Sequence, residues 1–230
     1  MARDSTSIER IAGVCERDID LLLLEEFLST PAFVSWFISS TGIPVLNAHD
    51  LKSARRSVTH TTGESDLELH FVVDSGDEYV ILIENKIGAQ LQPLQAERYN
   101  ARGTHYVANS VCQNYYTVIV APDAYFRDVG QTKGFQYRLS YNRIVDWFDS
   151  AEELGRRRNY KLAMLRSALD KATLGYQPLL DDAVTDFFSA YWDIATLEHP
   201  ELGMRRSNRE RPSGSGRVYF KTHGLSAIQC

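Results

Sequence analysis

Two short stretches decide the fold of this chain: GESDLE at residues 63–68 and ILIENK at residues 81–86. The first leads into residues 67–73, where Leu67, Leu69, Phe71 and Val73 alternate with other residues, and the second lies within a run over residues 79–87 that is dense in β-branched side chains. Both compositions are typical of β-strands, and the Asp-Ser-Gly-Asp sequence at residues 74–77 predicts a turn between them. We therefore predict a β-hairpin.

The hairpin carries charged side chains where apolar ones are expected. Alternate side chains of a strand share a face, so Glu84 and Lys86 point to the same side and Asn85 to the other. Burying such charges is costly unless they pair or bind a metal. Asp66 and Glu84 are each about eight residues from the turn, so the hairpin can bring the two carboxylates together.

This arrangement predicts a metal site. Two carboxylates and a nearby backbone carbonyl, such as that of Asn85, are hard oxygen ligands of the kind Mg²⁺ prefers. We predict Asp66, Glu84 and the Asn85 carbonyl as ligands. The bound metal would polarise a scissile phosphate and lower the pKa of a bound water, while Lys86 would orient that water and offset developing charge.

The spacing of these residues resembles a known nuclease superfamily. Asp66, followed after seventeen residues by Glu84-x-Lys86, is similar to the PD-(D/E)xK signature, although Ser65 stands where the name of the motif has Pro. The likeness covers roughly residues 16–150. It implies a restriction-endonuclease-like fold and a nuclease that uses Mg²⁺, with Mn²⁺ as a substitute.

Further residues gain candidate roles from this resemblance. Gln95 and Tyr99 lie one helical turn apart and resemble the QxxxY motif of RecB-type and λ-exonuclease-type members, which implies that they position the active site or the DNA. Members usually add an acidic residue from the first core helix. Glu25 and Glu26 are the candidates, with Glu25 preferred, and Glu64 is a further possible helper.

The rest of the chain favours an α/β fold in which a mixed central sheet is flanked by helices and followed by extra C-terminal helices. Helical spacing over residues 16–40 is interrupted at Thr30, a suitable N-cap, and Pro31. Residues 57–62 read as a polar approach to the hairpin. A helix is expected from Pro93 to about Ala101, closed by Gly103. Strands are expected over residues 115–121 and 135–139. Further helices are expected through Ile144, Trp147 and Phe148, and over residues 159–173 and 180–197.

Composition bounds the class of protein. The chain has 230 residues, of which 43% are hydrophobic and 24% charged, with a formal net charge of −5. This predicts a nuclease-like domain over residues 1–200 and a polar tail, or the start of a further element, over residues 201–230. We expect no membrane segment and no secretory signal. The three cysteines make no CxxC pair, which favours a reducing compartment, and we predict the cytoplasm.

Three functional hypotheses follow. The first is a metal-dependent hydrolase that cuts phosphodiester bonds of DNA as an (endo)deoxyribonuclease, with RNA still open as substrate and endo versus exo action still open. Its setting in bacterial antiviral defence or repair rests on the resemblance alone. The second is a catalytically silent nuclease fold that binds nucleic acid or a protein partner. The third is an effector that acts as a homodimer or awaits a regulatory partner. The intact Asp66, Glu84 and Lys86 argue against the second hypothesis.

Overall fold

The chain forms two compact units, Met1–Gly175 and Tyr176–Cys230. Our computed structural model describes residues 11–44, 46–60, 63–127, 133–174, 181–206, 210–211 and 215–220. The division after Gly175 differs from the predicted boundary at residue 200, because the last long helix clusters with the C-terminal segment.

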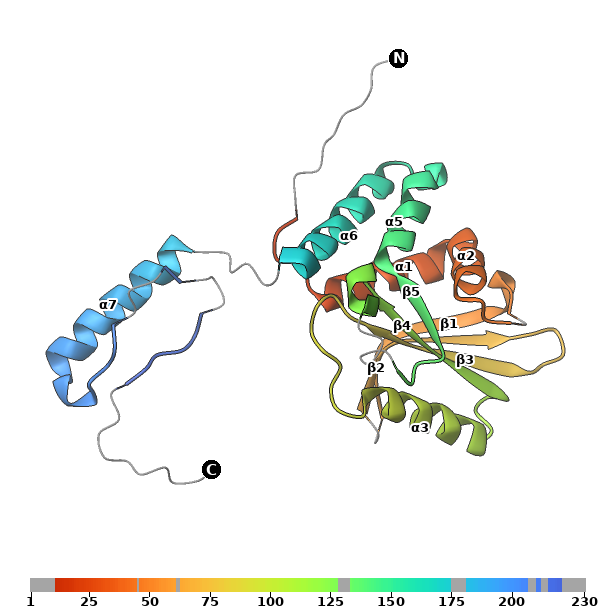
Figure 1. Cartoon of the computed structure of the whole chain (residues 1–230), viewed down its shortest axis with the longest axis horizontal. Coiled ribbons are helices and arrows are strands. Elements are labelled where there is room, and N and C mark those ends of the chain that lie inside the picture. The colour runs from red at the N-terminus through yellow and green to blue at the C-terminus, as the bar shows by residue number, and fades with distance from the viewer. Residues whose placement is uncertain are drawn as a thin grey trace, which may run out of the picture. The chain divides into compact units, whose positions relative to one another are not determined.

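The first unit is built on one five-stranded mixed sheet (Figure 1). Its strands lie in sequence order: β1 (Leu51–His60), β2 (Gly63–Val72), β3 (Glu78–Asn85), β4 (Asn114–Ala121) and β5 (Tyr137–Ser140). β1, β2 and β3 pair antiparallel, and β3, β4 and β5 pair parallel. The predicted hairpin and the mixed α/β architecture are therefore confirmed.

β1 was not expected as a strand from its sequence. It lies at the edge of the sheet, and Lys52 and Arg55 are exposed; over residues 51–59, where burial is described, only Ala54 is buried. An edge strand with this much solvent contact lacks the apolar alternation that identifies a strand. The predicted polar approach over residues 57–62 thus falls largely within β1, and residues 61 and 62 lie outside the described part.

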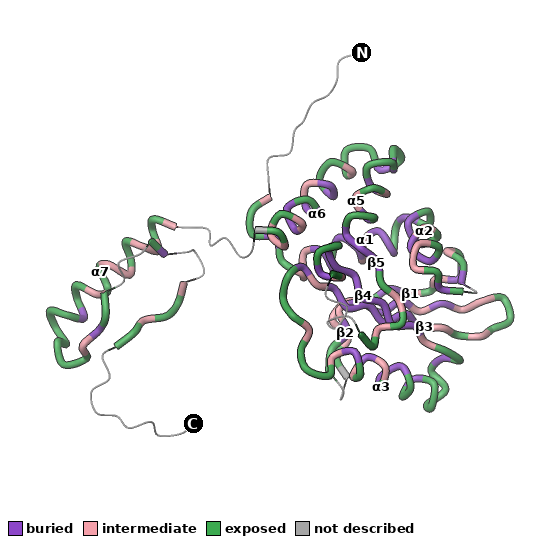
Figure 2. The backbone as a smooth tube through the Cα atoms, in the orientation of Figure 1, coloured by how far each residue is buried: buried purple, intermediate pink, exposed green. Residues whose placement is uncertain are grey.

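Helices cover both faces of the sheet (Figure 1). α1 (Glu16–Ser29), α2 (Pro31–Thr41), α5 (Tyr141–Ser150) and α6 (Arg156–Leu174) lie on one face, and α3 (Gln95–Ala108) lies on the other. The larger core lies on the four-helix side, and β3 and β4 are buried from their third residue onward (Figure 2). This core includes Phe27, Phe33, Phe37, Leu67, Leu69, Ile81, Ile83, Val118, Val120 and Phe148.

The predicted break between the first two helices is confirmed. α1 ends at Ser29, Thr30 precedes α2, and Pro31 is its first residue. Gly42 closes α2 with φ 78°, in the left-handed region that glycine adopts readily. Within the described part, no single helix is long and apolar enough to cross a bilayer; α1 and α2 meet that criterion only together, across a bend of 112°.

The predicted end of α3 at Gly103 is wrong. The helix starts at Gln95, after Leu94 with φ 58°, and continues to Ala108. Gly103 lies inside the helix because Tyr115 of β4 packs directly against it: a Cβ at this position would meet the Tyr115 ring at 2.1 Å. The glycine therefore permits close approach of helix and strand and does not terminate the helix.

The second unit is organised around α7 (Asp182–Glu198), followed by the short turn η4 (Pro200–Leu202). The Trp192 indole donates a hydrogen bond to the Met204 carbonyl at 3.1 Å, and Met204 forms an isolated antiparallel bridge with Phe220. The Arg211 guanidinium lies 3.9 Å from the centre of the Phe188 ring. The predicted C-terminal helix is confirmed, and the described tail residues fold back onto it.

Candidate active site

The hairpin brings Asp66 and Glu84 to the same point of the sheet. The pairing of β2 with β3 includes Leu67 opposite Ile83, which places Asp66 opposite Glu84 one residue further on. Asp66 Oδ2 accepts a hydrogen bond from the Asn85 backbone N–H at 2.8 Å. Glu84 is only 1% exposed. The predicted convergence of the two carboxylates is therefore present in the structure.

Lys86 lies just beyond the end of β3 and faces Glu84. Its Nζ is 2.7 Å from Glu84 Oε1, and its backbone N–H donates to the Val120 carbonyl of β4 at 2.9 Å. Burial alone would lower the pKa of Lys86, but the Glu84 carboxylate outweighs that effect and the pKa is raised. Lys86 is thus a protonated ammonium at neutral pH.

The electrostatics of the site suit a divalent cation. Burial, and secondly the Glu84 carboxylate, raises the pKa of Asp66 to about 8. Apart from its contact with Lys86, Glu84 Oε1 accepts no hydrogen bond within the described residues. A buried carboxylate beside a partly buried one makes a donor set that a bound cation would stabilise.

Tyr99 reaches the carboxylates from α3, on the opposite face to α1. Its hydroxyl accepts a hydrogen bond from the Asp66 backbone N–H at 3.2 Å and donates to the Ile83 carbonyl at 3.3 Å. Tyr99 is 1% exposed, and burial raises its pKa well above the ordinary value. Neutral Tyr99 therefore holds β2 and β3 together beside the two acids, which agrees with the positioning role implied for it.

Gln95 is not brought to the carboxylates. Its Oε1 accepts a hydrogen bond from the Gln92 backbone N–H at 2.8 Å, within the turn that begins α3. In the described part of the chain, Gln95 has no recorded contact with Asp66 or Glu84. The role implied for Gln95 stays a prediction.

Asn85 joins the site to α1. Its side-chain amide donates to Asp20 Oδ1 at 2.7 Å and to the Glu16 carbonyl at 3.0 Å, and its Oδ1 accepts from the Tyr141 hydroxyl. Burial is the main reason that the pKa of Asp20 rises to about 6. These bonds fix the backbone of Asn85, whose carbonyl is a predicted metal ligand, although the ligand role itself is untested.

The structure argues against Glu25 as the acidic residue from the first helix. Glu25 is engaged by Lys161 and by Arg157, whose Nη1 is 2.5 Å from Glu25 Oε1. Glu26, the alternative, is buried with Lys161 Nζ 2.6 Å from its Oε1. Both acids therefore serve the packing of α1 on α6.

Glu16 is a second acidic residue of α1, besides Asp20, that approaches the site. Its Oε1 accepts a hydrogen bond from the Ile87 backbone N–H at 3.0 Å, directly after Lys86. Glu16 and Asp20 are one helical turn apart and share a face, whereas Glu25 lies about 180° around the helix from Glu16 at roughly 100° per residue. Once Asn85 is known to contact α1, helical geometry places Glu16, and not Glu25, on the side of the helix that faces the carboxylates.

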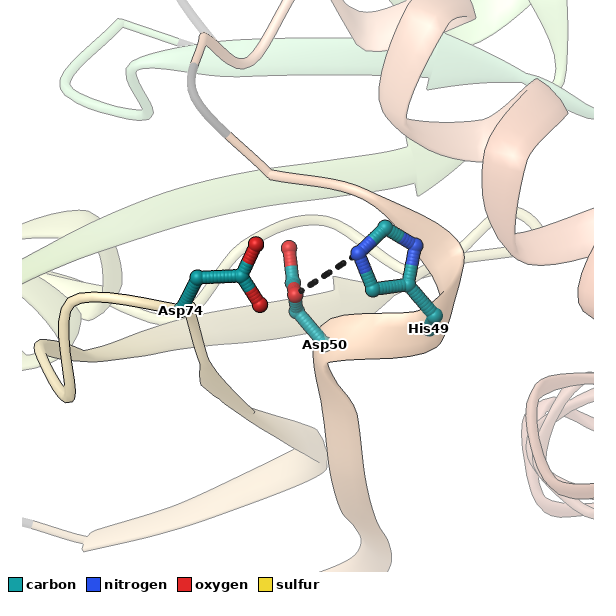
Figure 3. A group of neighbouring side chains, drawn as sticks. All are labelled: His49, Asp50 and Asp74. Atoms are coloured by element: carbon teal, nitrogen blue, oxygen red, sulfur yellow. Dashed lines mark ion pairs between the residues drawn. The ribbon is translucent and has the colours of Figure 1, made fainter.

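A second group of potential metal ligands was not predicted from sequence. His49, Asp50 and Asp74 present ligand atoms within 4.8 Å of one another, as Figure 3 shows. Asp50 is buried, and its Oδ2 already accepts a hydrogen bond from the Asn47 backbone N–H at 3.0 Å. Its Oδ1 lies 3.3 Å from His49 Nε2. Asp74 lies past the end of β2 remote from Asp66, so this group is separate from the carboxylate pair.

One family model matches the chain. Residues 34–168, more than half of the chain, match the model of a family described as the PD-(D/E)XK nuclease superfamily. This range contains β1 to β5, α3 and most of the carboxylate site. No curated protein matches the sequence significantly.

Proposed function

Because the chain belongs to the PD-(D/E)XK nuclease superfamily, we propose that it is a metal-dependent nuclease whose active site contains Asp66, Glu84 and Lys86. Members of the superfamily typically hydrolyse phosphodiester bonds and generally use divalent metals. One observation carries the assignment to these residues: Asp66 and Glu84 converge across the β2–β3 hairpin, with the Lys86 ammonium 2.7 Å from Glu84.

Asp66 and Glu84 would hold the metal together with the Asn85 carbonyl, and Glu16 is the acidic residue of α1 placed to assist them. We propose Mg²⁺ as the ion, with Mn²⁺ as a substitute, because hard oxygen donors make up the set. A cation bound there would polarise the scissile phosphate and lower the pKa of a bound water.

Lys86 acts as a fixed positive charge. Its raised pKa keeps it protonated, so it does not serve as a general base at neutral pH. As a donor beside Glu84, it can orient the attacking water and stabilise negative charge that develops on the phosphate. Tyr99 contributes by holding the backbone of Asp66 and Ile83 in place.

We propose DNA as the substrate. Support comes from the likeness of Gln95 and Tyr99 to a motif of DNA-processing members and from the placement of Tyr99 at the carboxylates. We further propose a cytoplasmic role in bacterial antiviral defence or repair, with homodimerisation or a regulatory partner controlling activity.

The test is cleavage of supercoiled plasmid, linear duplex and a single-stranded RNA with Mg²⁺, Mn²⁺ or EDTA. Wild type is compared with Lys86→Ala, and Lys133→Ala serves as the matched control because Lys133 is exposed. We expect metal-dependent nicking or linearisation of the plasmid, lost in Lys86→Ala and retained in Lys133→Ala. Cleavage of RNA alone would overturn the assignment of DNA. Cleavage that persists in Lys86→Ala would overturn the assignment of the site.

A further inference from the structure

A buried polar network lies beneath β2, next to the carboxylate pair. Arg102 of α3 is 1% exposed, and Ser65 and Glu68 of β2 are fully buried. Arg102 Nη1 donates to Ser65 Oγ, and Ser65 Oγ donates to Glu68 Oε1 at 2.8 Å. The Tyr106 hydroxyl donates to Glu68 Oε2 at 3.1 Å. Buried charges are costly unless they are hydrogen-bonded, so this network specifies one arrangement of β2 on α3.

The strand ladder does not hold the backbone at Asp66. The pairing of β1 with β2 includes Arg56 opposite Leu67 and Val58 opposite Ser65, and it passes over Asp66 between them. Ser57, which faces Asp66 there, has φ 52°, outside the extended region. On the other side, the pairing with β3 ends at Leu67. The backbone of Asp66 therefore needs support from elsewhere.

That support comes from two side chains of α3. Tyr99 and Arg102 are three residues apart and share a helix face. Tyr99 accepts the Asp66 N–H, Arg102 binds the side chain of Ser65, and the Arg102 guanidinium lies 5.1 Å from the centre of the Tyr99 ring. The peptide bond that joins Ser65 to Asp66 is thus held at both ends by one helix.

We propose that Arg102 and Ser65 are positioning residues that set the orientation of the Asp66 carboxylate for metal binding. Ser65 occupies the place where the PD-(D/E)xK motif has Pro, which restricts the backbone through its ring. Here a hydrogen bond from Arg102 restrains the same residue through its side chain. This inference rests on the proposed function, since it treats Asp66 as a metal ligand.

The test compares two variants that each delete one hydroxyl bonded to Glu68. Ser65→Ala removes the contact with Arg102 beside Asp66, whereas Tyr106→Phe removes a bond of the same network away from Asp66. Mn²⁺ binding to the full chain is measured by calorimetry, with thermal unfolding measured in EDTA. We expect Ser65→Ala to weaken Mn²⁺ binding about tenfold, the scale of losses when partners of metal ligands are removed. Tyr106→Phe should lower the melting temperature but leave Mn²⁺ affinity unchanged.

Two results for the folded variants would overturn the inference. Unchanged Mn²⁺ affinity in Ser65→Ala, or equal weakening in both variants, would show that Ser65 serves the packing of β2 alone. If Ser65→Ala does not fold, Arg102→Lys replaces it, because it keeps the buried charge near Glu68 but loses the planar fork that reaches Ser65. Wild type that binds no Mn²⁺ would instead overturn the proposed function, whereas wild type that binds and cleaves keeps that function whatever the variants do.

Discussion

The raised pKa of Asp66 makes metal affinity steeply dependent on pH. A carboxyl group binds a cation in its ionised form, and burial beside Glu84 raises the pKa of Asp66 to about 8. Below that pH the metal must displace a proton from Asp66. Raising the pH through this value removes the competition, so affinity increases with pH and then levels off.

The magnitude follows from the fraction of Asp66 that is ionised. With a pKa of about 8, the ionised fraction is about 1% at pH 6, about 50% at pH 8 and about 90% at pH 9. The Mg²⁺ association constant should therefore rise about fiftyfold between pH 6 and pH 8, and by less than about twofold between pH 8 and pH 9. A carboxylate with an ordinary pKa of about 3.9 would give a flat profile over the same range.

The assay is isothermal titration of Mg²⁺ at fixed ionic strength across this pH range, with Asp20→Asn as the matched control. Asp20 is a second buried acid, with a pKa of about 6, and the substitution keeps an oxygen for the Asn85 amide. Asp20→Asn should retain the rise toward pH 8. A flat profile in wild type would refute the reasoning. If the rise disappears in Asp20→Asn, the group that titrates is Asp20 and not Asp66.

Three further outcomes are expected from single substitutions. Because the pKa of Asp66 is raised in the folded protein, its contribution to stability is present below about pH 4 and is lost as the pH rises toward 8. In thermal unfolding in EDTA, Asp66→Asn should therefore gain stability relative to wild type over that pH range. Tyr99→Phe deletes the acceptor of the Asp66 N–H and should cost about 1 kcal/mol in urea unfolding, together with weaker Mg²⁺ binding. Gly103→Ala places a Cβ 2.1 Å from the Tyr115 ring, so unfolding in urea should show a net destabilisation of about 1–3 kcal/mol despite the helix propensity of alanine; unchanged or increased stability would show that the ring moves aside freely.

The hairpin could be predicted because its pattern is local. The turn at residues 74–77 and the apolar runs beside it determine the pairing of β2 with β3, and the register then places Asp66 opposite Glu84. The ion pair of Lys86 with Glu84 follows from strand alternation alone. These inferences need only residues that are close in sequence, and the structure agrees with them.

The features that were missed depend on partners distant in sequence. Gly103 resembles a helix end until Tyr115 is placed against it. Glu25 is equivalent to Glu16 as an acidic residue of the first helix until Asn85 shows which side of α1 faces the sheet. Both Gly103 and Glu25 could be interpreted only by knowing which face of their helix packs inward. A weakly amphipathic helix such as α1 does not specify that face by itself.

Ser65 shows why a departure from a motif needs the structure for its interpretation. By sequence, serine in place of proline only weakens the match, because a proline restricts the backbone without any partner. A serine can do so only through a hydrogen bond, and its partner, Arg102, lies thirty-seven residues further along the chain. The bond to Arg102 restrains Ser65 only while α3 remains packed on β2. The orientation of Asp66 is therefore tied to the docking of α3, which also supplies Tyr99 to the same peptide.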